Sequence, residues 1–147
     1  MPFQRCRPLA LMLLTLASSG CALLEGPPAN PLIGTWATAD RNKVTFAAEA
    51  VIVTPDKGAP TTMSKAECNG VYTLAYGRMQ TAPLKQLFPK QADLTGQLNR
   101  LLVKPEYPVA EVTCDRGGTT YLMLDDGQVL AIYRDGAVGG IERMTRA

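Results

Sequence analysis

The sequence contains no histidine, and this absence removes most of the common catalytic constellations. A Ser-His or Cys-His nucleophilic pair needs an imidazole as its base, and zinc sites in proteins rely on histidine or on several cysteines. Serine is scarce as well, because Ser64 is the only one beyond residue 20, and Lys65 follows it directly rather than three positions later. We therefore expect a protein that is not an enzyme and that needs no metal or non-covalent cofactor.

The sequence also lacks a clear excess of positive or negative charge. The chain has 15 basic and 13 acidic residues, and two of the basic ones, Arg5 and Arg7, lie in a segment that we expect to be removed. Without these two arginines the chain has 13 basic and 13 acidic residues and a net charge of zero. No basic patch stands out either, which argues against nucleic acid as a partner. Asp125 and Asp126 are the one adjacent pair of aspartates, but Gly127 follows them, as is typical of a hairpin turn rather than of paired catalytic carboxylates.

No apolar run is long enough to span a membrane. The longest, Leu9 to Ala17, follows Arg5 and Arg7 and precedes the small residues 18 to 20. At about 1.5 Å per residue this run reaches less than half of the roughly 30 Å hydrocarbon core. A basic start, a short apolar stretch and small residues before a cleavage point are typical of an export signal. We expect residues 1 to 20 to be that signal.

Ser19, Gly20 and Cys21 resemble the lipobox of bacterial lipoproteins, in which a small residue precedes an obligatory cysteine. The resemblance implies cleavage before Cys21, a diacylglyceryl group on its sulfur and an acyl group on its new amino terminus. Ala22, rather than an aspartate, is similar to the pattern that directs such proteins to the outer membrane. Residues 21 to 31 contain three prolines and form a tether, so residues 32 to 147 remain as one domain.

Two cysteines are left after this processing, because Cys6 lies in the signal and Cys21 carries the lipid. In an oxidising envelope compartment, two remaining cysteines in one small domain most often form a disulfide, so we expect Cys68 and Cys114 to be paired. Closing a loop of about 46 residues contributes roughly 4 kcal/mol by the chain-entropy estimate. Two free buried thiols, or a thiol site for copper or redox chemistry, are the alternatives.

Short segments rich in valine, tyrosine and threonine alternate with turn residues, which predicts a mainly β domain. The Asp-Gly pairs at 126–127 and 135–136 predict tight turns, so the last three strands should form a meander. Residues 55 to 67 are expected to be a loop, and Gly117-Gly118 and Gly139-Gly140 to separate strands. The eight expected strands are 35–38, 43–47, 51–54, 71–76, 109–114, 120–124, 129–133 and 140–144.

Between residues 80 and 103 the apolar spacing becomes helical. Pro83 suits the first turn of a helix, Pro89 ends that segment, and Leu94, Leu98 and Leu102 then repeat every four residues. We expect two short helices inserted into an antiparallel sheet or a small barrel of about eight strands. An α+β domain is the alternative.

The strand that starts Gly34-Thr35-Trp36, followed by residues 43–46 and 70–74, resembles the opening of lipocalin-like barrels and of small Gly-x-Trp outer-membrane lipoproteins. Residues 124 to 146 are similar to the last strands of barrel-type metalloprotease inhibitors of the Inh family. The lipocalin resemblance implies a ligand pocket in the barrel mouth, for which Trp36, Phe46, Tyr72 and Tyr121 are the candidate lining residues.

Three kinds of function fit these observations. The first is a non-catalytic lipoprotein, anchored in the outer membrane with its domain facing the periplasm, which binds envelope proteins or has a structural role. The second is a carrier of a small apolar ligand. The third is an inhibitor of a periplasmic or secreted protease, whose only natural reactive segment is the tether before Trp36.

Overall fold

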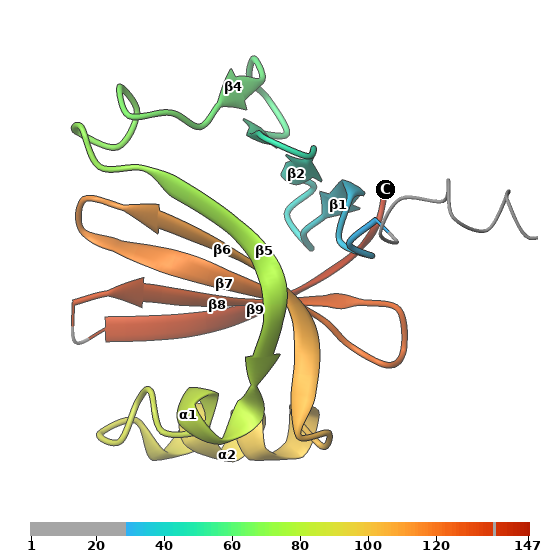
Figure 1. The fold of residues 1–147 in the computed structure, drawn as a ribbon, viewed down its shortest axis with the longest axis vertical. Helices are drawn as coiled ribbons and strands as arrows, with labels where there is room; N and C mark the ends of the chain where they lie inside the picture. Colours follow the sequence, from blue (N-terminus) through green and yellow to red (C-terminus); the bar gives the residue numbers. More distant parts are fainter. Residues whose placement is uncertain (1–28, 137) are drawn as a thin grey trace, which may run out of the picture.

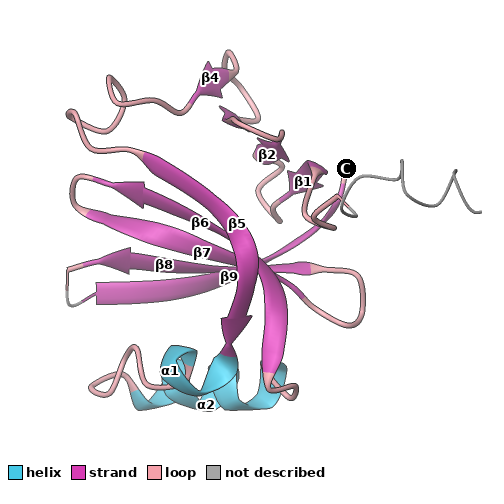
Figure 2. Cartoon of the chain, viewed as in Figure 1, coloured by secondary structure: helices cyan, strands magenta, loops and turns pink. Residues whose placement is uncertain are grey.

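The protein is described by a computed structural model that covers residues 29 to 136 and 138 to 147. It is mainly β, as expected, with one nine-stranded antiparallel sheet curled into a half-barrel and two short helices inserted in it (Figures 1 and 2). The strands are β1 (Gly34–Ala37), β2 (Lys43–Phe46), β3 (Val51–Thr54), β4 (Thr61–Thr62), β5 (Thr73–Gln80), β6 (Glu106–Cys114), β7 (Gly117–Met123), β8 (Val129–Asp135) and β9 (Val138–Arg146), and the helices are α1 (Thr81–Leu84) and α2 (Ala92–Leu101).

The strand order is β4-β3-β2-β1-β9-β8-β7-β6-β5, so the first four strands form one arm of the sheet and the last five form the other. The arms join where β1 pairs with β9, with Trp36 opposite Arg146. The sheet ends at β4 on one side and at β5 on the other, so it is an open curled sheet rather than a closed barrel. Strand β4 corrects the expectation of a plain loop over 55 to 67, because Thr61 and Thr62 pair with β3.

The larger arm is a continuous meander from β5 to β9. The predicted meander of the last three strands is therefore confirmed, and it extends over five. Gly127 has φ +77° and Gly136 has φ +59°, which are the left-handed values that the Asp-Gly pairs predicted. At the first of these turns the amide of Leu124 donates to the carbonyl of Gln128 across 2.8 Å.

Both faces of the meander are buried, because consecutive residues of its strands join different cores. Tyr121 and Ala131 belong to a cluster shared with β1, β2 and β3. Their neighbours Leu122 and Ile132 belong to a second cluster shared with the helical insertion. A strand alternates its side chains between faces, so two-sided burial explains why β8 begins with an unbroken apolar run, Val129 to Ile132. The interior of the half-barrel holds the first core.

The helical insertion covers the outer face of the meander, at the lower end of the sheet in Figure 1. Leu94 and Leu98, four residues apart on α2, are buried on the face that meets the sheet, and burying a leucine contributes about 1.5 to 3 kcal/mol. Thr81, at the start of α1, closes the insertion because its hydroxyl donates to the carbonyl of Lys104 across 2.8 Å. Sequence spacing therefore placed both helices, but α1 ends at Leu84 and not just before Pro89, which corrects the expected end of the first helix.

The two Gly-Gly pairs do not separate strands, which corrects that expectation. Gly117 and Gly118 begin β7, and Gly139 and Gly140 lie inside β9. The reason is close packing: a Cβ on Gly139 would lie 1.9 Å from the ring of Phe88, which follows α1. Gly139 is therefore the place where the helical insertion lies directly on the backbone of the sheet.

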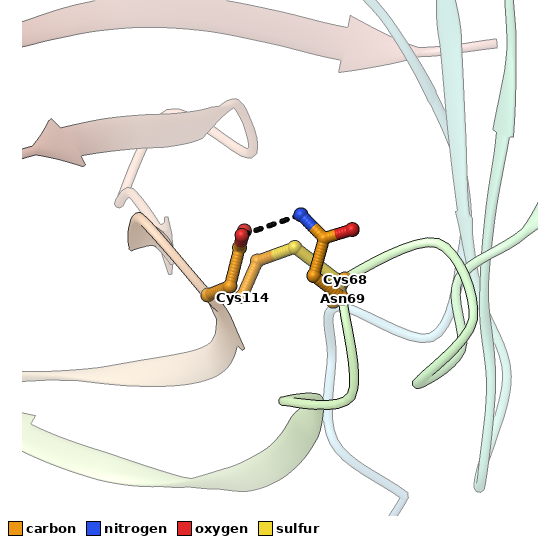
Figure 3. Close-up of a disulfide and its surroundings, with 4 residues drawn as sticks. Cys68, Asn69 and Cys114 are labelled. Carbon is orange, nitrogen blue, oxygen red and sulfur yellow. Dashed lines mark hydrogen bonds between the residues drawn. A yellow bond between two sulfur atoms is a disulfide. The ribbon is translucent and has the colours of Figure 1, made fainter.

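Cys68 and Cys114 are joined in a disulfide, with their Cα atoms 4.9 Å apart (Figure 3). The bond connects the segment before β5 to the end of β6, in agreement with the expected pairing. Beside it the side-chain amide of Asn69 donates to the carboxylate of Asp115 across 2.6 Å, as the dashed line in Figure 3 marks. Cys68 is fully buried.

Candidate functional site

The segment that leads into β1, residues 29 to 33, is fixed to the domain; we call it the lead-in segment. Asn30 holds its start in two ways: its side-chain oxygen accepts from the amide of Leu32 across 3.0 Å, and its side-chain amide donates to the carbonyl of Val109 on β6 across 3.3 Å. The side chain of Leu32 is fully buried in the first core. The chain therefore joins the domain in a defined orientation.

The Gly-x-Trp motif holds the end of the same segment. The indole N–H of Trp36 donates to the carbonyl of Leu32 across 2.8 Å. Gly34, with φ +129°, leaves space that the guanidinium of Arg146 occupies. That guanidinium lies 4.1 Å from the centre of the Trp36 ring and donates to the carbonyl of Ile33 across 3.1 Å. The motif thus builds a clamp in which Trp36 and Arg146 hold the lead-in segment from two sides.

An apolar groove of about 760 Å³ opens next to the lead-in segment. Its size lies in the range of ligand sites in proteins, which is about 300 to 1,000 Å³. The groove lies between the lead-in segment, the turn from β2 to β3, the middle of β5 and the first half of β6. The lining residues are Ala29, Asn30, Pro31, Ile33, Ala48, Tyr76, Gly77, Arg78 and Pro108.

Tyr76 fixes the two walls of this groove to each other. Its hydroxyl donates to the carbonyl of Ala47 across 2.6 Å, which ties the β2–β3 turn to β5. Burial raises the pKa of the Tyr76 hydroxyl, and the neighbouring Tyr72 adds to that effect. The hydroxyl therefore remains a neutral donor at physiological pH, and the turn that carries Ala48 stays in place.

The polar side chains of the lining already have partners. Arg78 forms an ion pair with Glu106 on the adjacent strand, and the side chain of Asn30 bonds to Leu32 and Val109. An apolar ligand gives up no hydrogen bonds with water, whereas a polar ligand would lose such bonds and find few free partners here. The groove consequently suits an elongated hydrocarbon better than a sugar or a nucleotide.

The four aromatic residues that were expected to line a pocket come together in the structure, but in the first core. Trp36 and Phe46 are each 1% exposed and Tyr121 is 7% exposed, while Tyr72 is partly buried against them. The rings of Phe46 and Tyr121 meet edge to face with their centres 4.8 Å apart. Burial raises the pKa of Tyr121 to about 12. These side chains fill the interior of the half-barrel and offer little surface to a ligand.

Asp125 and Asp126 lie in the turn between β7 and β8 and have the local partners expected of turn residues. Asp125 pairs with Lys104. Asp126 accepts from the amide of Gln128 across 3.0 Å and from Arg143 across 3.0 Å. Each carboxylate therefore acts as a structural anchor for the hairpin.

Cys21, the expected site of lipid attachment, lies outside the described residues, as do the expected signal and most of the tether. Over residues 29 to 136 and 138 to 147, no helix is long and apolar enough to cross a membrane. In the same part of the chain, no three acidic, cysteine or histidine side chains are grouped as metal ligands would be.

No protein-family model matches this chain, and no curated protein or solved structure matches it either.

Sequence reasoning missed Asn30, Tyr76 and Arg146 as residues that shape the groove. A signal existed for Asn30, because an asparagine between Ala29 and Pro31 is typical of a turn that caps its own backbone. Arg146 gave no local signal, since its partner Ile33 lies 113 residues earlier in the chain.

Proposed function

We propose that this chain is a non-catalytic lipoprotein of the bacterial envelope, held on the outer membrane by lipid on Cys21 and acting through binding. The observation that carries the proposal is the order of the first residues: two arginines, a nine-residue apolar run, and Ser19-Gly20-Cys21. Two or more acyl chains anchor a protein stably, whereas one chain anchors it only marginally.

The lead-in segment supports this role because it joins the domain rigidly. Seven residues lie between Cys21 and Ala29, which makes eight steps along the chain, and an extended chain spans at most about 3.3 to 3.6 Å per residue. The groove therefore lies within about 30 Å of the anchored residue. A tether of this length keeps the anchored domain close to the membrane surface.

The absence of histidine from the sequence and the structural roles of Asp125 and Asp126 support a non-catalytic function. A binding role needs only accessible surface, and β5 offers some of it. Among residues 29 to 136 and 138 to 147, the eight residues of β5 pair only with β6, so within this part of the chain the other edge of the strand keeps its backbone groups free for another strand.

The test is Cys21→Ser in the full-length chain, followed by incorporation of labelled fatty acid and by membrane fractionation. The variant should lose the label, and it should either remain as an uncleaved precursor or be released in soluble form. Cys6→Ser is the matched control, because it removes a thiol within the signal and should leave acylation and sedimentation unchanged. If Cys21→Ser protein is cleaved normally and still sediments with the outer membrane after a high-salt wash, the proposal is wrong.

A further inference from the structure

The apolar groove is a built feature rather than a gap between loops. Its walls are the lead-in segment, the β2–β3 turn, and the strands β5 and β6. The bonds from Asn30 to Val109 and from Arg146 to Ile33 hold the lead-in segment, and the bond from Tyr76 to Ala47 ties the turn to β5. A site whose walls are held before the ligand arrives pays less conformational entropy on binding. The groove is thus ready to bind without rearrangement.

The chemistry of the lining selects hydrocarbon. Ala29, Pro31, Ile33, Ala48 and Pro108 expose only carbon from their side chains. The polar lining side chains, Asn30, Tyr76 and Arg78, are already bonded to other parts of the domain. A ligand without hydrogen-bonding groups along most of its length therefore matches the groove, and a polar headgroup would have to remain at its exposed mouth.

The position of the groove indicates where such a ligand comes from. Ala29, the first residue that the structure describes, lines the groove. The chain before it runs eight residues to Cys21, which keeps the groove within about 30 Å of the anchor. We infer that the groove binds one acyl chain of a membrane lipid, with the lipid headgroup left outside. This location rests on the proposed lipid anchor, whereas the affinity of the groove for an acyl chain does not.

The experiment uses the chain from residue 21 to 147 with Cys21→Ser, which carries no lipid of its own. Parinaric acid, a fluorescent polyene fatty acid, is titrated into this protein, and palmitate is then added as an unlabelled competitor. We expect saturable binding of one fatty acid per chain and its displacement by palmitate. Because this protein is never acylated, the result does not depend on whether Cys21 is an anchor in the cell.

Ala48 is the residue to change, because it is exposed, lies in a turn and lines the groove. Ala48→Asp places a carboxylate against the acyl chain and Ala48→Trp fills the space. Each should weaken binding by about tenfold or more, since a charge cannot be desolvated there without a partner and a filled site has no room for the chain. Ala66→Asp and Ala66→Trp are the matched controls, because Ala66 is also exposed but lies outside the lining.

The controls should bind like the parent, and circular dichroism should show all variants folded. The inference is overturned if no saturable binding occurs, if palmitate fails to displace the probe, or if the Ala48 and Ala66 variants bind alike. Binding of an extended apolar peptide in place of the fatty acid would likewise overturn it. Failure of the Cys21→Ser fractionation test, with fatty-acid binding intact, would instead refute the anchor and leave the groove as a lipid site.

Discussion

Gly34→Ala tests the clamp around the lead-in segment at the residue whose backbone and surroundings leave the least room for a side chain. Gly34 has φ +129°, a backbone conformation that side chains with a Cβ rarely adopt. A Cβ at this position would also lie 2.1 Å from the Nη1 atom of Arg146. The substitution therefore strains the backbone and displaces the guanidinium that covers Trp36.

The two effects can be given magnitudes separately. A residue held in a sparsely populated backbone region costs of order 1 to 3 kcal/mol. Moving the guanidinium loses its hydrogen bond to Ile33 and its contact with the Trp36 ring. The lost contacts are worth about 1 kcal/mol together, because they are exposed to solvent. We expect Gly34→Ala to lower the free energy of unfolding by roughly 2 to 4 kcal/mol, a large part of the 5 to 15 kcal/mol typical of a domain.

Equilibrium unfolding in guanidinium chloride measures this change. Trp36 is the only tryptophan of the chain and is 1% exposed, so its fluorescence reports the unfolding of the clamp itself. Far-UV circular dichroism serves as a second probe of the whole sheet, and coincident transitions justify a two-state analysis.

A double-mutant cycle separates strain from contact. In an Arg146→Met background no guanidinium remains to be displaced, so Gly34→Ala should then cost only the backbone component, roughly 1 to 3 kcal/mol. If Gly34→Ala changes the free energy of unfolding by less than about 0.5 kcal/mol in both backgrounds, it behaves like an ordinary surface substitution. The explanation of the Gly-x-Trp motif as a clamp would then be refuted.

Three further results are expected. Replacing Cys68 and Cys114 by alanine should lower the free energy of unfolding by about 2 to 5 kcal/mol, and adding reductant should destabilise the parent but not this variant; an equal response of the two proteins would contradict the role of the disulfide. Tyr76→Phe should cost about 1 kcal/mol, since it removes the bond to the carbonyl of Ala47, and denaturant unfolding would count against that bond if the midpoint did not move. The pKa of Tyr121 is raised from 10.0 to about 12 in the folded chain, so the folded state holds this proton more tightly than the unfolded state. The contribution of Tyr121 to stability should be fully present below pH 10 and should be lost as the pH rises toward 12. When the free energy of unfolding is measured against pH, Tyr121→Phe should show a shallower fall than the parent, and an unchanged slope would rule out this residue as the cause.

Local patterns in the sequence were enough for most of the fold. The strand at Val51–Thr54 and the Asp-Gly turns follow from residues that are neighbours in the chain. β5 and β6 extend further toward the helical insertion than predicted, because Met79 and Tyr107 pair across them and pack into the second core. That core is completed by the helical insertion, so the residues next to these strand ends in the chain do not reveal it.

The candidate site could not be predicted from local sequence patterns, because its contacts join residues that are far apart in the chain. Gly139 looked like a strand separator because the ring of Phe88, which requires a glycine there, comes from a distant part of the chain. Trp36 and Tyr121 were expected to line a ligand pocket, but the short strands β1, β2 and β3 of one arm and the meander of the other bury them together. The Gly-x-Trp motif indicates the position of a tryptophan in the first strand. Which residues cover that tryptophan depends on how the two arms of the sheet pack together.

The pairing of β1 with β9 delays the completion of the sheet, because the two strands lie at opposite ends of the domain. Trp36 faces Arg146, and the amide of Ala147 donates to the carbonyl of Thr35 across 3.0 Å. A chain that is synthesised or threaded through a translocation pore with its amino end leading has its first strand waiting, unpartnered on this side, until more than a hundred further residues have arrived. Contacts of such long sequence separation form late and slowly. The sheet of this domain therefore cannot be completed until almost the whole chain is available.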